Sequence, residues 1–324
     1  MGEMNPNLLL ELKHLADTLD GAYRLLDANG AGSGQAASVE TVRPSLFEEC
    51  IGLCRQRVPW DAGPIRTIHH LSCTGGTLIT KCLAAMPNVL VLNEIDPLST
   101  MTPKGGTFNP DKPPFTPTDI VSLLRQGDRK VPEGLLVKLF LKNLDLLRDE
   151  YGRAGRRLLL RDHSHSHFLA GDEIAQRPSL LSMVKSRFPV LSVVTVRHPI
   201  DSFLSLESHG WPNCPRKFEE YCRRYHAFLD AHEEVPVFRY EDFVNDPSAI
   251  VAELCQSLEL SYSESFLDTF DVFRFSGDSG RTGMTIEARP RREVNEDFLA
   301  EVNSSSVSVE LLSRLGYESG GRDA

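Results

Sequence analysis

Short apolar segments alternate with amphipathic segments over most of the chain. The apolar segments are rich in Val, Ile and Leu and have the length of buried strands, at 65–72, 89–94, 156–165, 191–199 and 235–242. The segments between them repeat apolar residues at helical spacing and predict helices over 78–86, 134–151, 180–188, 201–208, 218–232 and 249–260. This alternation predicts an α/β fold, in which helices cover both faces of a mainly parallel central sheet.

The first 60 residues do not follow this alternation. Leucines near helical spacing predict a helix over 7–28, and the small residues at 29–38 indicate a linker. We therefore expect an N-terminal helical extension over 1–60, a catalytic domain over 61–300, and a C-terminal helix or tail over 301–324.

The composition is typical of a globular protein, with 41% hydrophobic and 25% charged residues. A formal net charge of −10 argues against broad nucleic-acid binding, although a local cluster of arginines can still bind an anionic ligand. The sequence contains no apolar run of about 18 residues, so we expect no membrane span. Its 7 cysteines include no CxxC pair, which predicts reduced thiols and a cytoplasmic location.

The first candidate site is the turn that follows the first predicted strand. It consists of Ser72, Cys73, Thr74, Gly75, Gly76 and Thr77. Glycines let backbone N–H groups approach an anion, and the following helix adds the positive end of its dipole. The turn lacks the GK[ST] ending of nucleotide-triphosphate loops, and an ordinary tight turn between a strand and a helix has a similar composition.

The second candidate site follows the fourth predicted strand. Arg197 is expected at the end of this strand and Pro199 at the first helical position, with Ser205 one helical turn after Asp201. A guanidinium fork and a hydroxyl that meet at the carboxyl end of a strand suit a phosphate. The structural alternative is that Arg197 pairs with Asp201 as a helix cap.

The order of these motifs resembles the sulfotransferase superfamily. The glycine turn is followed by VRHPxDxxLS at 196–205 and by FRYEDF at 238–243, in which Tyr240, Glu241 and Asp242 match a family hallmark. The resemblance covers about residues 65–290. It implies a P-loop-like α/β fold and the co-substrate 3′-phosphoadenosine 5′-phosphosulfate (PAPS).

The resemblance also implies roles for single residues. The turn 72–77 would hold the 5′-phosphosulfate end of PAPS, and Arg197 and Ser205 would hold its 3′-phosphate. A later Gly/Ser loop, 275–283, resembles the loop that covers this phosphate in the family and makes Arg281 a further candidate. Weaker candidates for the same phosphate are Arg289, Arg291 and Arg292. The rings expected to flank the adenine are Trp211 and Phe203.

One position departs from the family pattern. Sulfotransferases usually have Lys or Arg in the turn where this chain has Cys73, and a thiol cannot neutralise a leaving phosphate. Either Lys81 or Arg161 supplies the missing charge, or the activity is altered. A nucleophilic Cys73 is the alternative; we favour a small wall residue, because the chain lacks the Arg five residues later that a cysteine-phosphatase loop has.

The third predicted strand, 156–165, runs into a histidine-rich loop. By resemblance to cytosolic sulfotransferases, Arg161 aligns with the lysine and His163 with the catalytic histidine of a Lys-Thr-His motif. His163 is then the general base, and Arg161 stabilises charge on the transferred group. Glu94 is the rival base, because its place after the second strand resembles the catalytic Glu of the tyrosyl-protein branch.

The same loop raises the question of a metal. In an extended chain His163, His165 and His167 would lie on one face, which would suit zinc. We expect no metal in the reaction, because sulfuryl transfer does not need one, and polar loop histidines are the plainer interpretation.

Together these motifs predict a sulfotransferase that moves a sulfuryl group from PAPS to a hydroxyl or amine acceptor by in-line displacement. The acceptor classes left open are small-molecule (phenolic), carbohydrate, lipid-linked and peptide compounds, and the oligomeric state is open as well. Two alternatives stay in view. A P-loop-type small-molecule kinase would need a lysine in the turn, and a non-catalytic nucleotide-binding relative would be compatible with Cys73.

Overall fold

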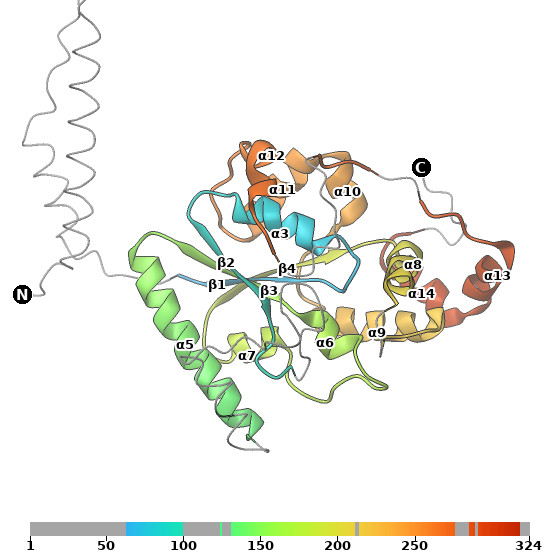
Figure 1. Ribbon diagram of the computed structural model, residues 1–324, viewed down its shortest axis with the longest axis horizontal. Helices are drawn as coiled ribbons and strands as arrows, with labels where there is room; N and C mark the ends of the chain where they lie inside the picture. The colour runs from blue at the N-terminus through green and yellow to red at the C-terminus, as the bar shows by residue number, and fades with distance from the viewer. Residues whose placement is uncertain are drawn as a thin grey trace, which may run out of the picture. The chain divides into compact units, whose positions relative to one another are not determined.

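The fold is built on a five-stranded sheet in which neighbouring strands are parallel. The computed structural model describes residues 63–99, 124, 131–210, 214–275, 285–288 and 291–317. The strands are β1 (Ile65–His69), β2 (Val89–Ile95), β3 (Arg157–Asp162), β4 (Val190–Val196) and β5 (Val237–Arg239). Their spatial order is β2-β3-β1-β4-β5 (Figure 1). The predicted parallel α/β fold is thus confirmed.

Helices cover both faces of this sheet (Figure 1). On one face lie α3 (Gly76–Ala84), α10 (Tyr240–Asn245), α11 (Pro247–Ser257), α12 (Phe266–Thr269) and the short 3-10 helix η1 (Phe270–Val272). On the other lie α5 (Glu133–Arg153), α6 (Ser164–Phe168), α7 (Leu180–Lys185) and α9 (Phe218–Asp230). Beside α9 pack α8 (Pro199–His209), α13 (Glu296–Ser304) and α14 (Ser306–Arg314).

The alternation of side chains along each strand supplies both cores. Leu159 packs with Ile79 of α3, whereas its neighbours Leu158 and Leu160 pack with Leu144 of α5 on the opposite face. Strands that are buried on both faces need apolar residues at successive positions. The continuous apolar runs in the sequence are therefore explained by the helices on both sides.

Two predicted boundaries are wrong in an informative way. Strand β3 ends at Asp162, and the histidine-rich segment that was expected to be a loop forms α6. The strand expected over 235–242 contains only three residues, and Tyr240 already begins α10. The two acidic residues that follow Tyr240 suit the first turn of a helix, because they face the positive end of its dipole.

The chain divides into two units, Met1–Asp61 and Ala62–Ala324. The helical extension predicted for 1–60 lies outside the described residues, so the proposed domain limits stay predictions. Within the part that is described, no helix combines the length and the apolar character that crossing a membrane requires.

We expect Leu144→Ala to lower the free energy of unfolding by about 2–5 kcal/mol, because it removes a fully buried side chain between α5 and the sheet. Leu146→Ala on the same helix is the control: this side chain is 62% exposed, and its loss should change stability by less than about 0.5 kcal/mol. Urea denaturation of both variants measures the difference. Equal effects would mean that α5 does not pack on the sheet as described.

Candidate active site

The predicted turn 72–77 follows β1 and includes the first two residues of α3, at the carboxyl end of the sheet, where parallel α/β folds bind ligands. Gly75 has a left-handed φ of +83° and caps α3, which begins at Gly76. A Cβ on Gly75 would lie 2.2 Å from the Tyr240 ring, and one on Gly76 would lie 2.1 Å from the His70 ring. Both positions therefore require glycine, because two rings pack directly against the turn.

Cys73 lies in this turn with a left-handed φ of +67°. Burial raises the pKa of its thiol, although a hydrogen bond with Ser205 and the charge of Arg197 oppose the rise. A reactive cysteine needs the opposite shift, since the thiolate is the nucleophile. The environment of Cys73 therefore favours a wall residue over a nucleophile.

Arg197 and Ser205 converge on the same residue of the turn. Arg197 Nη1 donates to the Cys73 carbonyl oxygen at 3.3 Å, while Ser205, on α8, hydrogen-bonds the Cys73 thiol. The expected proximity of Arg197 and Ser205 thus has a structural counterpart. The alternative in which Arg197 pairs with Asp201 is wrong, because Asp201 Oδ2 accepts from Arg291 Nε at 3.1 Å.

Arg161 reaches the other side of the turn from β3. Its Nη2 donates to Thr77 Oγ1 at 2.7 Å, its Nε to His70 Nε2 at 2.8 Å, and its Nη1 to Asn93 Oδ1 at 2.7 Å. The other candidate for the missing positive charge, Lys81, lies in the last turn of α3, away from the helix N-terminus. Arg161 is therefore a cation that contacts the turn directly, through Thr77.

His70 has a defined protonation state as a result. Because His70 Nε2 accepts from Arg161, its proton must lie on Nδ1, which donates to the Leu71 carbonyl oxygen at 3.0 Å. Burial and the neighbouring Arg161 lower the pKa of His70 to about 3. The residue is a neutral packing partner for Gly76, and the sequence analysis did not single it out.

Tyr240 and Glu241 contact the glycine turn and the segment that carries Arg197. The Tyr240 ring packs on Gly75, and the guanidinium of Arg197 lies over it at 5.1 Å from the ring centroid. Glu241 accepts from the backbone N–H of His198 at 2.9 Å and from the Tyr317 hydroxyl at 2.6 Å. Tyr240 therefore supports the Arg197 guanidinium, and Glu241 fixes the backbone at the next residue, His198.

Both base candidates lie beside Arg161. Glu94 is the last residue but one of β2 and has a left-handed φ of +51°, and its carboxylate is 3.6 Å from Arg161 Nη1. His163 precedes the first residue of α6, and its carbonyl oxygen accepts from Ser166 Oγ at 2.9 Å. Burial lowers the pKa of His163, although the carboxylates of Glu94 and Asp96 oppose the shift. A neutral His163 at pH 7 is compatible with a general base.

Asp96 anchors the segment that carries His163. It accepts from Arg177 Nη1 at 2.6 Å and Nη2 at 2.5 Å, and also from Ser166 Oγ. Burial alone would raise the pKa of Asp96, but these hydrogen bonds lower it below the ordinary value. This buried ion pair ties the end of β2 to α6 and to the loop that follows α6.

The described residues do not form the three-histidine zinc site, because the chain is helical over Ser164–Phe168 and not extended. The centroids of the His163 and His165 rings lie 4.0 Å apart, whereas the His167 ring stacks on Phe168. Among the described residues, the ligand-type side chains that come close enough to bind a metal are His69, Asp162 and His232.

Only some of the remaining candidates for nucleotide binding lie within the described residues. Arg281, Arg289 and Trp211 lie outside the described residues. Arg292 Nη1 donates to the Leu204 carbonyl oxygen at 3.3 Å, which places it beside α8. Phe203 is 3% exposed and packs against Phe218 and Phe298, so it is part of an aromatic core and not a free ring beside adenine.

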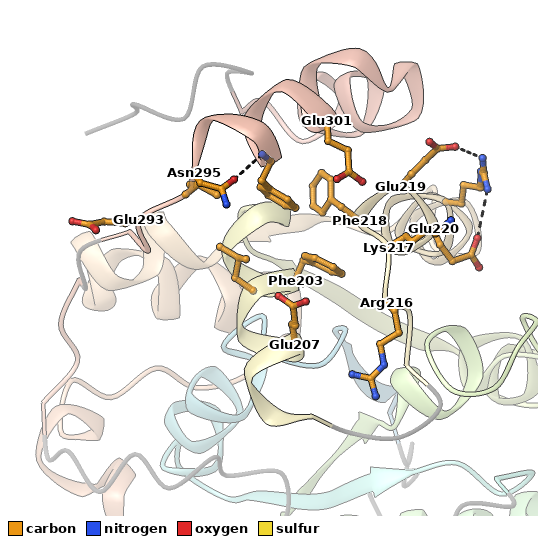
Figure 2. Close-up of a pocket in the computed structure, with 14 residues that line it drawn as sticks. Phe203, Glu207, Arg216, Lys217, Phe218, Glu219, Glu220, Glu293, Asn295 and Glu301 are labelled. Atoms are coloured by element: carbon orange, nitrogen blue, oxygen red, sulfur yellow. Dashed lines mark hydrogen bonds and ion pairs between the residues drawn. The ribbon is translucent and has the colours of Figure 1, made fainter.

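A cavity of about 960 Å³ opens beside this aromatic core, between α8, α9 and α13 (Figure 2). Its rim contains the acidic residues Glu207, Glu219, Glu220, Glu293 and Glu301. They outnumber the basic residues of the rim, which are Arg216, Lys217 and Arg223. This cavity therefore does not suit a nucleotide with several negative charges, in contrast to the glycine turn.

Comparison with known proteins places the chain near solved sulfotransferases. The sulfotransferase domain from the curacin biosynthetic pathway is 16% identical, with a TM-score of 0.43, over 79% of this chain and 98% of that one. The sulfotransferase domain from the Synechococcus PCC 7002 olefin synthase is 16% identical, with a TM-score of 0.44, over 79% of this chain and 95% of that domain. Mouse sulfotransferase SULT7A1, solved in complex with PAP, is 11% identical, with a TM-score of 0.36, over 79% and 84%.

No protein-family model and no curated protein matches the chain. The structural similarity lies in the fold, and its TM-scores are low.

Gly76→Ala should lower the free energy of unfolding by about 1–3 kcal/mol, because the added methyl group overlaps the His70 ring and that ring is held by two hydrogen bonds. Gly134→Ala is the matched control on α5, where an added Cβ meets nothing within 4 Å and should be neutral or slightly stabilising. Denaturant titration compares the two. Wild-type stability of Gly76→Ala would contradict the packing of His70 on the turn.

Proposed function

We propose that this chain is a sulfotransferase that moves a sulfuryl group from PAPS to a hydroxyl or amine acceptor. The observation that carries the proposal is the position of two guanidinium groups on opposite sides of the glycine turn. Arg161 contacts Thr77 from β3, and Arg197 contacts Cys73 from the end of β4. PAPS carries negative charge at both its 5′-phosphosulfate and its 3′-phosphate, which matches two separate cations beside one helix N-terminus.

Each group has a role in this proposal. The first turn of α3 and Arg161 stabilise negative charge on the transferred group and on the 5′-phosphate that leaves, so that Arg161 replaces the basic residue absent at Cys73. Arg197 and Ser205 hold the 3′-phosphate, with Arg281 as a further candidate. The acceptor oxygen attacks sulfur as the bond between sulfur and the 5′-phosphate oxygen breaks.

The proton of the acceptor hydroxyl goes to His163 in this mechanism. Its lowered pKa keeps the imidazole neutral, and the nearby carboxylate of Glu94 stabilises the imidazolium that forms on proton transfer. Glu94 is the alternative base, and its carboxylate already forms an ion pair with Arg161 Nη1 at 3.6 Å.

The setting of the reaction is part of the proposal. The five cysteines in the described residues are free thiols, which is compatible with the cytoplasm. The net charge of −10 favours a small-molecule, carbohydrate or lipid-linked acceptor over a nucleic acid.

We expect adenosine 3′,5′-bisphosphate, and not ATP with Mg²⁺, to raise the thermal unfolding midpoint of the full chain. Arg197→Ala should weaken bisphosphate binding by about 10- to 100-fold, through the loss of a charge-assisted contact. Arg223→Ala is the control, since this exposed arginine pairs with Glu219 on α9, and it should bind normally. Stabilisation by ATP alone would support the kinase alternative, and normal binding by Arg197→Ala would remove that residue from the site.

A transfer assay with sulfur-radiolabelled PAPS and pooled acceptors tests the reaction itself. Label should enter one acceptor class, and His163→Ala should lower kcat by about 10²- to 10⁴-fold with bisphosphate affinity unchanged. If Glu94→Ala shows that loss and His163→Ala does not, Glu94 is the base. Bisphosphate binding without label in any acceptor would favour the non-catalytic relative.

A further inference from the structure

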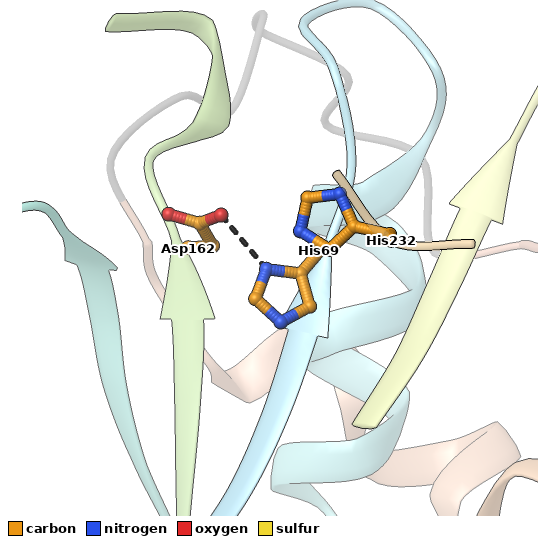
Figure 3. A group of neighbouring side chains, drawn as sticks. All are labelled: His69, Asp162 and His232. Atoms are coloured by element: carbon orange, nitrogen blue, oxygen red, sulfur yellow. Dashed lines mark hydrogen bonds and ion pairs between the residues drawn. The ribbon is translucent and has the colours of Figure 1, made fainter. Parts of the chain in front are cut away.

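Three buried side chains meet at the carboxyl ends of β1 and β3, on the side of the sheet opposite α3: His69, Asp162 and His232 (Figure 3). His69 ends β1, and Asp162 ends the neighbouring strand β3. Because side chains alternate along a strand, these two point away from His70 and Arg161, which belong to the candidate active site. His232 follows α9, the helix that covers this face. The cluster is therefore separate from the proposed transfer site.

The potential ligand atoms of the cluster are close together. All lie within 4.8 Å of one another, and His69 Nδ1 is 2.8 Å from Asp162 Oδ2. The rings of His69 and His232 have centroids 4.4 Å apart. Zinc bonds of about 2.0–2.1 Å in a tetrahedral arrangement place ligand atoms about 3.3 Å apart, so an ion would fit after side-chain shifts of roughly an ångström or less.

His232 is held in the tautomer that a metal requires. Its Nδ1 is 2.7 Å from the carbonyl oxygen of Phe228, which can only accept, so the ring proton lies on Nδ1 and Nε2 carries a lone pair. His232 Nε2 is buried and has no hydrogen-bond partner among the described residues. A ring nitrogen bound to a carbonyl, with the other nitrogen bare, is the usual arrangement of a metal-binding histidine.

The other two side chains have similar support. His69 Nε2 is 2.8 Å from Thr67 Oγ1, which is 2.7 Å from Ser192 Oγ, and Asp162 Oδ2 accepts from Ser164 Oγ at 2.7 Å. These hydroxyls orient the imidazole and the carboxylate from outside the cluster. A hydrogen bond between His69 and Asp162 would satisfy those two side chains alone, and the buried Nε2 of His232 would still have no partner.

We propose that His69 Nδ1, Asp162 Oδ2 and His232 Nε2 bind a divalent transition-metal ion of the zinc class. The ion takes the place of the proton between His69 and Asp162 and gives the His232 lone pair a partner. Two imidazoles and a carboxylate are donors that zinc, cobalt and iron(II) accept, whereas Mg²⁺ and Ca²⁺ prefer oxygen ligands.

The role of this ion is structural. It links the ends of β1 and β3 to the segment after α9, and each strand end also carries one residue of the candidate active site. His70 follows His69 directly, and Arg161 directly precedes Asp162. Metal binding therefore stiffens the backbone from which His70 and Arg161 extend, without contact between the ion and the transferred group.

Cobalt titration of the full, chelator-stripped chain tests the site, because Co²⁺ bound by nitrogen and oxygen ligands absorbs visible light. We expect one Co²⁺ per chain, displacement by one Zn²⁺ with loss of the absorption, and no displacement by Mg²⁺. His232→Leu, which replaces a buried ring by an apolar side chain, and Asp162→Asn should each weaken binding by at least about 10-fold. His226→Gln, on α9 but bonded to the Val307 carbonyl oxygen, should bind like the wild type.

The proposal is overturned if the wild-type chain takes up less than one Co²⁺ per chain without a defined absorption, or if His232→Leu and Asp162→Asn bind as tightly as His226→Gln. Several weakly bound ions that none of the variants affects would show surface binding only and would also overturn it. A second readout is thermal unfolding: Zn²⁺ should raise the midpoint of the wild type and of His226→Gln and leave His232→Leu unchanged. The wild-type stoichiometry decides the question even if a variant fails to fold.

Discussion

The buried guanidinium of Arg161 is the constraint on which the candidate active site depends. Its side chain is 3% exposed, and a charge at that depth is tolerated only when its N–H groups have partners. Those partners come from two segments: His70 and Thr77 from the stretch that runs from the end of β1 into α3, and Asn93 from β2. These hydrogen bonds to Arg161 fix the His70 tautomer and hold a cation at the start of α3. They also keep the His70 ring against Gly76.

The same strand ends serve both faces of the sheet. Along β1 and β3, His70 and Arg161 extend toward α3, while His69 and Asp162 extend toward α9. The first pair supports the glycine turn, and the second pair forms most of the proposed metal site. Because the two pairs share a backbone, the geometry of one depends on how firmly the other is held.

The sequence predicted the layers of the fold well and their boundaries less well. Buried parallel strands leave continuous apolar runs, and covering helices leave a helical period, so the alternation was readable. Local composition could not decide where β3 ends, because the helix after it depends on tertiary contacts such as the bond from Ser166 to Asp96 and the pairing of Asp96 with Arg177. The three-histidine zinc site failed for this reason, since it required an extended chain.

What the sequence determined by itself was the parallel α/β layout, the turn at 72–77, and the spacing of eight residues between the strand-end Arg197 and Ser205. These features depend on local periodicity, glycine and spacing along a single segment. Only the tertiary structure decided that Arg161 contacts the turn, that Tyr240 and His70 are the reason for its two glycines, and that His69, Asp162 and His232 meet. Those contacts join segments far apart in the chain, and no local pattern records which strands become neighbours.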